Sequence, residues 1–577
     1  MKRSLLLTLG LVIAGLSVRN CHQDPRYIKI AVTTDVHGMV FPVDPASGEE
    51  LDYSLSHVYD YISRQKQAQD TTFFILDNGD FLQGQPAVYY YNFVDTVGEH
   101  LSSRIMNFMG YAAGTVGNHD IEAGPEVYNK IREEFHFPWL AANAIHSSTG
   151  LPYFEPFTVL KAGSCKIALL GMITPGIPNW LPQKLWPDMH FRDMVETARE
   201  WVPLIKETVH PDLLIGLFHS GLDYSYSGSD YHSNLNENAT IIVAREVPGF
   251  DIIFAGHDHR VNRDWVINSS GDSVLIIDPG SHARYVGEAV ITLPPDKKGK
   301  ASFEGRIIPI SAYKNSKAFM KKFRQDLNLV KEYVSDTVVY LAEDIQTIDA
   351  IFGPAPVTSL IHELQMKLSN ADISFTAPLS VHATLPAGYL RVSDMFDLYR
   401  YENALYVMEL SGYEIDRFLE YAVSHWFNVM KSPSDHLLLF SDNGSARLKN
   451  SAYNFSSAAG IRYTVDLNKT TGDRVTISEM DDGTIFSTDK TYRVALNSYR
   501  GTGGGGHLTA GAGIPKDELK NRIVWTSERD LRYYLMQELL DRDTLYPAAS
   551  DNWKLIPESF YASGKMADKT LLDRQNP

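Results

Sequence analysis

Five apolar runs in the first half of the chain each end in polar residues of the kinds that bind metals. The runs are short and rich in β-branched side chains, which favours buried strands. Longer mixed segments separate them, and two of these, residues 54–68 and 194–209, have the periodicity of amphipathic helices. This alternation indicates an α/β layered domain whose sheet is covered on both faces. The runs are IAVTTDVHG (30–38), FFILDNGD (73–80), AAGTVGNHD (112–120), LLIGLFHSG (213–221) and DIIFAGHDH (251–259).

The polar ends supply carboxylate, imidazole and amide groups. Asp35 and His37 are spaced D-x-H, and His257 and His259 are spaced H-x-H. In an extended segment residues i and i+2 point to the same side, so Asp35 and His37 are expected to reach one ion, and His257 and His259 repeat that geometry. A lone histidine at a strand end is more often a hydrogen-bonded core or surface residue, but five such ends predict a metal site. The mixture suits Zn, Mn, Fe or Co better than Ca. The other candidate ligands are Asp80, which can bridge two ions, Asn118 and His219.

Length and charge limit the class of protein. With 577 residues the chain is too long for one ordinary core, so two domains are expected. The hydrophobic fraction of 44% and charged fraction of 21% are typical of a globular protein. A formal charge of −17 argues against binding a nucleic-acid polymer through bulk electrostatics.

The first residues predict export. Lys2 and Arg3 precede an apolar stretch, residues 5–18, that is too short for a comfortable membrane span. Cys21 follows, as at a bacterial lipoprotein junction where the thiol is lipidated, although an arginine and an asparagine replace the usual small residues. Ordinary cleavage nearby is the alternative. We therefore expect a periplasmic or cell-envelope protein, with membrane attachment through Cys21 left open. The other cysteine, Cys165, is expected in the core.

The pattern along the chain divides it into five parts. Charged, helix-like residues follow the first domain and predict a linker, and a second region of mixed helical and strand-like character comes after it. The predicted parts are an export signal (1–21), a catalytic domain (26–312), a helical linker (313–339), a second α/β domain (340–560) and a polar tail (561–577).

The order D-x-H, DNGD, GNHD, H, GH-x-H resembles the calcineurin-like metallophosphoesterase signature over roughly residues 28–290. The resemblance implies a four-layered α/β/β/α fold and two divalent ions, of Zn, Mn, Co or Fe. One ion would take Asp35, His37, Asp80 and His259. The other would take Asp80, Asn118, His219 and His257, with Asp80 shared between the two.

The same resemblance gives the rest of GNHD a role. His119 would face the substrate phosphate, stabilise transition-state charge and protonate the leaving oxygen. Asp120 would orient the His119 ring and support its positive form. Two ions about 3.5–4 Å apart lower the pKa of a water between them and hold the phosphoryl oxygens.

The second region resembles the C-terminal domain of the 5′-nucleotidase family in residues 400–422, 453–467 and 497–506. In that family this domain binds the nucleoside, with the base between two aromatic rings. The matching positions are Tyr499 and an aromatic of YNFS, either Tyr453 or Phe455, with the spacing favouring Phe455. Arg500 and the glycine loop after it could approach a ligand closely.

The specificity is expected to be that of one branch of the family. Members that hydrolyse 5′-monophosphates usually carry Asn-Gly-Gly-Ile-Arg, and residues 375–388 lack that arginine. With 397–405 and 551–557 they resemble instead the 2′,3′-cyclic-nucleotide 2′-phosphodiesterase/3′-nucleotidase branch, which commonly has Glu where this chain has Asp120. The expected partner is thus a small-molecule nucleotide. The alternatives are a 5′-nucleotidase or UDP-sugar hydrolase, and a non-catalytic surface protein that binds nucleotides.

Overall fold

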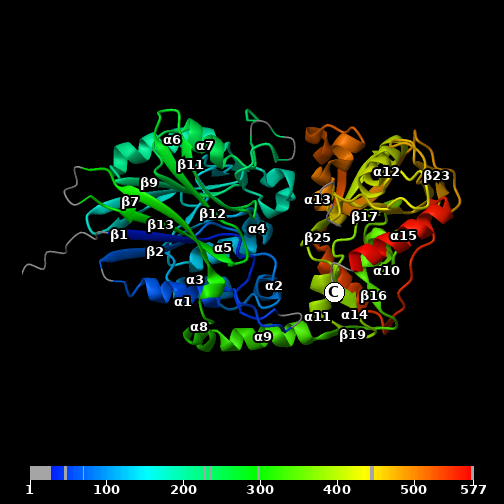
Figure 1. Cartoon of the computed structure of the whole chain (residues 1–577), viewed down its shortest axis with the longest axis horizontal. Coiled ribbons are helices and arrows are strands. Elements are labelled where there is room, and N and C mark those ends of the chain that lie inside the picture. The colour runs from blue at the N-terminus through cyan, green and yellow to red at the C-terminus, as the bar shows by residue number, and fades with distance from the viewer. Residues whose placement is uncertain are drawn as a thin grey trace, which may run out of the picture.

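The computed structural model describes residues 27–44, 48–68, 70–226, 229, 231–233, 235–294, 299–441 and 447–573. The predicted export signal and Cys21 lie outside these residues. Within them, no helix is both long and apolar enough to cross a membrane. Figure 1 shows two domains side by side, the first coloured blue to green and the second green to red.

The first domain contains two six-stranded sheets packed face to face. The first has the order β14-β13-β1-β2-β3-β4 and the second the order β11-β12-β10-β9-β7-β6. The first sheet is made of β1 (Tyr27–Thr33), β2 (Thr71–Asp77), β3 (Ala113–Thr115), β4 (Trp139–Leu140), β13 (Tyr285–Thr292) and β14 (Ser302–Pro309). The second is made of β6 (Phe157–Ala162), β7 (Cys165–Ile173), β9 (Leu213–His219), β10 (Ile252–Phe254), β11 (Val261–Ile267) and β12 (Ser273–Pro279).

Helices cover the outer face of each sheet, which confirms the predicted four layers. Side chains from both sheets, such as Ile30 of β1 and Leu217 of β9, form a core between the sheets. A second core joins the first sheet to α1 (Leu55–Gln65) and α3 (Leu101–Met109), and a third joins the second sheet to α6 (Met194–Val209) and α7 (Thr240–Glu246). Cys165 is buried at the start of β7, as predicted.

Strand direction decides where the polar run ends meet. β1, β2, β3 and β4 are parallel neighbours, as are β7, β9, β10 and β12 in the second sheet. Parallel strands place their carboxyl ends at one edge of a sheet, and the loops there carry the functional residues. The five predicted polar ends therefore converge on one side of the domain.

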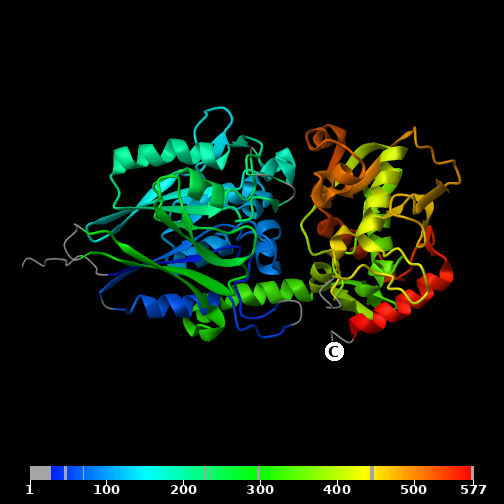
Figure 2. The same ribbon diagram turned by 45° about the horizontal axis from the view of Figure 1, so that its top comes forward.

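The segment predicted as a helical linker packs on the first domain. It folds into α8 (Lys317–Lys322) and α9 (Arg324–Ser335), and the apolar side chains of Phe319, Phe323 and Val330 are fully buried in the core below the first sheet. Figures 1 and 2 both show α9 running along this domain toward the second.

The second domain is built around the five-stranded sheet β21-β17-β24-β20-β25 with two three-stranded sheets. The predicted polar tail from residue 561 is instead helical, because α15 continues to Asp573 and the buried Asp568 accepts a hydrogen bond from Leu438 N at 2.8 Å. The strands are β15 (Thr337–Leu341), β17 (Ile373–Thr376), β19 (Gly388–Arg391), β20 (Ala404–Ser411), β21 (Ser457–Ala459), β22 (Ile461–Asp466), β23 (Val475–Met480), β24 (Thr491–Asn497), β25 (Ile523–Asp530), β26 (Thr544–Leu545) and β27 (Trp553–Ile556). The main helices are α10 (Pro356–Ser369), α11 (Val392–Leu398), α12 (Gly412–Trp426), α13 (Ser498–Gly501), α14 (Leu531–Leu540) and α15 (Glu558–Asp573).

Candidate metal and substrate site

The predicted ligands form two groups at the converging strand ends. In each group the candidate ligand atoms lie within 4.8 Å of one another: Asp35, His37 and His259 in one, Asp80, His219 and His257 in the other. Asn118 joins the second group, since its Oδ1 is 2.8 Å from His257 Nδ1 and 3.1 Å from His219 Nε2. The structure thus brings together all seven predicted ligands.

The D-x-H and H-x-H pairs reach their positions through turns, and the extended geometry predicted for them is wrong. Asp35 and His37 both have φ of 49°, and His257 and His259 have φ of 79° and 59°. Left-handed backbone at a non-glycine residue costs of order 1–3 kcal/mol and is found mainly at functional sites. Asp80 has the same conformation, with φ of 58°.

Glycine beside the ligands allows the loops to approach one another closely. A Cβ at Gly117 would lie 2.2 Å from Asp80 Oδ1. A Cβ at Gly256 would lie 2.1 Å from Thr34 Oγ1 and 2.8 Å from Asp35 Oδ2. The glycines of GNHD and GHDH therefore let the backbone of one loop pack against a ligand of another.

The donor atoms fit two divalent cations. His37 Nε2 and His259 Nε2 face each other at 2.9 Å, where two imidazoles can share at most one proton. Asp80 Oδ2 is buried and accepts no hydrogen bond of acceptable geometry among the described residues, although His219 Nε2 is 3.1 Å away. His219 Nδ1 donates to the Asn78 carbonyl at 2.7 Å, which leaves Nε2 directed at the site. These groups need a cation to be satisfied.

Burial and neighbouring charges favour the metal-binding form of four ligands, whereas at His219 Asp80 and Asp35 outweigh burial and raise the pKa to about 10. Burial lowers the pKa of His37 and of His257 to about 3, so both rings are neutral. Burial alone would raise the pKa of Asp35, but His219 and His259 outweigh it and lower the pKa to about 2. His219 and His119 likewise hold the pKa of Asp80 well below its ordinary value, against the effect of burial.

His119 lies beside the second group, and Glu122 is the carboxylate that contacts it. Both residues belong to the single turn α4 (Asn118–Glu122), where i and i+3 are neighbours, and His119 Nδ1 pairs with Glu122 Oε2. His119 Nε2 is 4.0 Å from Asp80 Oδ2. Burial would lower the pKa of His119, but Asp80 and Glu122 raise it to about 10, so the ring is positive at neutral pH.

The orienting role predicted for Asp120 is wrong. Its carboxylate accepts hydrogen bonds from the backbone N–H groups of residues 80, 81, 82 and 117, at 3.0, 2.9, 3.1 and 2.8 Å. Asp120 therefore fixes the loop that carries Asp80 instead of the His119 ring. The i, i+3 spacing of His119 and Glu122 is the signal in the sequence that could have identified Glu122.

His282 is a further imidazole at the site that the sequence analysis missed. It follows β12, its φ is 60°, and its ring centroid lies 5.4 Å from that of His37 and 5.9 Å from that of His259. The run SVLIIDPGSH (273–282) ends as the other five do, so the same pattern could have found it.

The structure separates the predicted aromatic residues of the second domain, because Phe455 packs in the core and Tyr453 lies beside Tyr499. Phe455 is fully buried and stacks on Trp426 with ring centroids 5.3 Å apart, so it belongs to the core. Tyr453 is partly exposed and meets Tyr499 edge to face at 6.1 Å. Tyr401 meets Tyr453 at 6.5 Å. We call Tyr401, Tyr453 and Tyr499 the tyrosine group.

Arg500 and the glycine loop after it contact the tyrosine group. The Arg500 guanidinium is buried and donates to the carbonyl of Gly504 at 2.6 Å and that of Tyr453 at 2.9 Å. A Cβ at Gly504 would lie 2.5 Å from the Tyr499 ring. The loop therefore packs against the Tyr499 ring. Arg500 is hydrogen-bonded to the backbone carbonyls around it, and this differs from the ligand contact expected of it.

The two domains meet next to His119. Lys184 Nζ donates to the carbonyls of Ser527 and Glu528 at 2.5 and 2.9 Å. Tyr89, from the first domain, is buried against Phe396 of the second. Glu122 and Glu402 line one small cavity between the domains. Burial raises the pKa of Glu402 to about 7, against the effect of Arg532.

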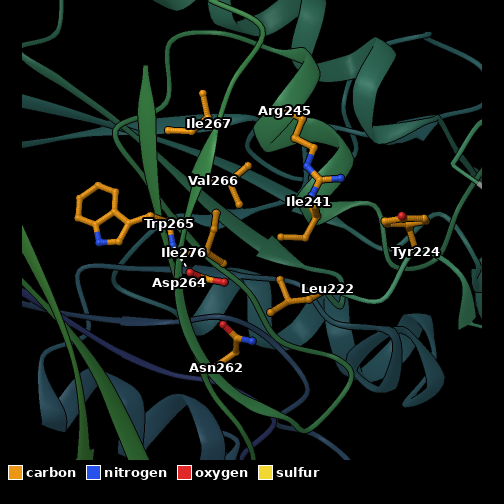
Figure 3. A pocket seen from close by; sticks show the side chains of 10 residues that line it. All are labelled: Leu222, Tyr224, Ile241, Arg245, Asn262, Asp264, Trp265, Val266, Ile267 and Ile276. Carbon is orange, nitrogen blue, oxygen red and sulfur yellow. Dashed lines mark hydrogen bonds between the residues drawn. The ribbon is translucent and has the colours of Figure 1, made fainter. Parts of the chain in front are cut away.

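A larger cavity lies away from this chemistry. It has a volume of about 480 Å³ and lies beside β11 and α7, where Figure 3 shows Trp265 on one side and Arg245 and Tyr224 on the other. None of the predicted ligands lines it, and its lining mixes aliphatic side chains with polar and aromatic ones. Its size alone does not connect it with phosphoester chemistry.

Two packed sheets with two ligand groups at their shared carboxyl edge define a binuclear metallohydrolase, and comparisons with known proteins agree. Residues 28–261 match the calcineurin-like phosphoesterase family, and residues 338–511 match the 5′-nucleotidase C-terminal domain. The chain is therefore a metal-dependent phosphoester hydrolase that joins a calcineurin-like phosphoesterase domain to a 5′-nucleotidase C-terminal domain. The non-catalytic alternative loses its basis.

Relatives with this architecture cover most of the chain. A 2′,3′-cyclic-nucleotide 2′-phosphodiesterase/3′-nucleotidase of Yersinia enterocolitica is 24% identical, over 96% of this chain and 92% of its own. The trifunctional nucleotide phosphoesterase YfkN of Bacillus subtilis is 25% identical over 92% of this chain, which spans 39% of that longer protein. A proposed 5′-nucleotidase of Staphylococcus aureus has the same fold, with a TM-score of 0.73 and 22% identity over 92% of this chain and 99% of its own.

Proposed function

We propose that the protein hydrolyses 2′,3′-cyclic nucleotides and then the resulting 3′-nucleotides to nucleosides. The observation that supports the proposal is the gathering of all seven predicted ligands beside His119 in one domain, in a chain whose other domain matches the 5′-nucleotidase C-terminal domain. Relatives named for these two reactions, from Yersinia enterocolitica and Salmonella typhimurium, align over more than nine-tenths of the chain. The absence of the 5′-nucleotidase arginine from residues 375–388 favours this branch.

Each residue has a part in the proposed reaction. Asp35, His37 and His259 would hold one ion, and Asn118, His219 and His257 the other, with Asp80 contributing to both. Two ions of Zn, Mn, Co or Fe would supply a nucleophile from water at neutral pH and neutralise phosphoryl charge. His119, held by Glu122, is positive and donates its Nε2 proton to the leaving ribose oxygen.

The substrate base would stack on Tyr499 and Tyr453. Stacking on aromatic side chains is worth about 1–3 kcal/mol per base and tolerates any base. In the cyclic substrate the first attack opens the ring to the 3′-phosphate, and the second releases phosphate, so one phosphate site serves both steps. A base held by the second domain keeps the nucleoside in place between them.

The test is turnover by the purified protein of 2′,3′-cyclic AMP, 3′-AMP, 5′-AMP and UDP-glucose, each with Mn, Co or Zn and with EDTA. Chromatography follows the 3′-AMP intermediate. EDTA-sensitive turnover of the first two with slow 5′-AMP is expected. Preference for 5′-AMP or UDP-glucose would overturn the specificity and keep the chemistry. The matched control is His119→Ala, which should lose turnover and keep its bound metal.

A further inference from the structure

A tryptophan packs on one of the metal ligands, and the proposed reaction gives it no part. The ring centroids of Trp180 and His257 lie 5.4 Å apart, and the two ring planes are 33° apart. This separation is within the range of about 4.5–7 Å that aromatic pairs prefer. The indole is partly exposed, and its N–H can only donate, so Trp180 cannot itself be a ligand. Any effect of Trp180 on the metal site must therefore act through His257.

His257 lacks the hydrogen bond that orients other ligand histidines of this site. The Nδ1 atoms of His219 and His37 lie 2.7 and 3.3 Å from the backbone carbonyls of Asn78 and Gln83. Such a partner fixes the ring of a metal-binding histidine. In His257, Nδ1 faces an amide oxygen of the site at 2.8 Å, and Nε2 has no hydrogen-bond partner among the described residues. The contact with the indole is what remains to orient this ring.

The loop that carries Trp180, residues 174–186, is attached to the metal site at its start. We call it the bridging loop. Its first residue, Thr174, donates its backbone N–H to the carbonyl of the ligand His219 at 2.8 Å. A Cβ at Gly176 would lie 2.4 Å from the Trp180 ring, so the indole lies directly against the loop backbone. Trp180 N donates to the Ile177 carbonyl at 3.1 Å. The bridging loop therefore fixes both the backbone and the ring of Trp180.

The bridging loop is also held beyond Trp180. Trp186 Nε1 donates to the carbonyl of Leu181 at 3.0 Å, and the Leu181 side chain is buried in the core of the first domain. Between these two residues, Lys184 Nζ donates to two carbonyls of β25 in the second domain. The loop is thus attached on both sides of Trp180, and the fold sets the place of the indole against His257.

We propose that Trp180 is a positioning residue of the metal site, whose indole holds the His257 imidazole in the orientation that binds the ion of the second group. This rests on the proposed assignment of His257 to that ion. A ring that is already oriented loses less freedom when the ion binds, and binding is tighter for that reason. Among the described residues, His257 is the one predicted ligand whose ring pairs with Trp180, so the effect is confined to one of the two ions.

The experiment titrates the metal-free protein with Mn by calorimetry. Wild type should show two classes of site, and His257→Ala identifies the class that depends on His257. Trp180→Leu keeps apolar bulk in the bridging loop and removes the flat ring, so it should weaken that class about 10- to 100-fold and spare the other. Trp180→Phe keeps a ring and should bind as wild type does. The matched control is Trp265→Ala, which removes an indole that is 47% exposed on β11.

Wild-type binding by Trp180→Leu would overturn the proposal. An equal loss of both classes would also overturn it, because that result assigns the effect to the fold of the bridging loop and not to the ring on His257. A wild type in which His257→Ala weakens neither class would overturn it as well. The titration needs no nucleotide, so failure of wild type to cleave 2′,3′-cyclic AMP or 3′-AMP would overturn the proposed function and leave this inference standing.

Discussion

Asp120 and Glu122 lie two residues apart on α4, and their replacement is expected to have different consequences. Glu122→Gln keeps the shape of the side chain and removes the charge that contacts His119 Nδ1. Residues that support a functional imidazole typically contribute 10- to 100-fold, so we expect kcat/KM on 3′-AMP to fall by about that factor. This equals about 1.4–2.7 kcal/mol of transition-state stabilisation.

Asp120→Asn should instead reduce stability. The carboxylate accepts four backbone N–H groups, and an amide offers only one oxygen, so two of those donors lose their partner. At about 1 kcal/mol for each lost hydrogen bond the cost is about 2 kcal/mol. For a domain of roughly 300 residues that lowers the Tm by about 3 °C.

The assay pairs rate with unfolding. Steady-state turnover of 3′-AMP and p-nitrophenyl phosphate is measured for both variants with saturating Mn, and thermal unfolding is followed on the same samples. p-Nitrophenolate leaves without a proton, so Glu122→Gln should lose less on that substrate than on 3′-AMP. Wild-type rates in Glu122→Gln, together with a rate loss at unchanged Tm in Asp120→Asn, would return the orienting role to Asp120.

Three further outcomes are expected. EDTA should abolish turnover and lower the Tm, because the facing nitrogens of His37 and His259 and the buried Asp80 need a cation. Added Mn or Zn should restore both. An unchanged Tm in EDTA would contradict this. Phe455→Ala should cost about 3–5 kcal/mol of stability, whereas Tyr499→Ala should raise KM for 3′-AMP at unchanged stability. A raised KM at unchanged stability in Phe455→Ala would instead place Phe455 in the base site. The Glu402 pKa of about 7 exceeds the ordinary value of 4.5, so the folded state binds the proton more tightly than the unfolded state, and stability falls as pH rises from 4.5 to 7. Glu402→Gln should flatten that decline in profiles of Tm against pH. An unaltered slope would refute the prediction.

The ligand set could be predicted from the sequence because its signal repeats. Each ligand follows a run that is recognisably a buried strand, and parallel strands bring their carboxyl ends to one edge whatever the loops do. The backbone at the ligands could not be predicted, because i, i+2 spacing fits both an extended segment and the left-handed turns that Asp35 and His37 adopt. His282 was missed although its run has the same form.

A charged segment can still carry a packed face. Residues 313–339 are highly charged, but a helix needs only one apolar stripe to join a core, and Phe319, Phe323 and Val330 provide it. After residue 561 a polar group, the buried carboxylate of Asp568, attaches α15 to the domain. Spacing could not separate Phe455 from Tyr453, because the two residues are only two positions apart. Only the packing of Phe455 on Trp426 shows which ring is in the core.

The two domains divide the work of the proposed reaction. The first domain holds the complete ligand set and His119, so it can carry out phosphoester hydrolysis on any substrate that reaches it. The second holds the tyrosine group, and Glu402 faces Glu122 across the domain boundary. Under the proposed function, specificity depends on the tyrosine group of the second domain, which includes Tyr499. Variants at the domain boundary should therefore change which nucleotide is cleaved. Variants of the metal ligands at the strand ends should decide whether any nucleotide is cleaved.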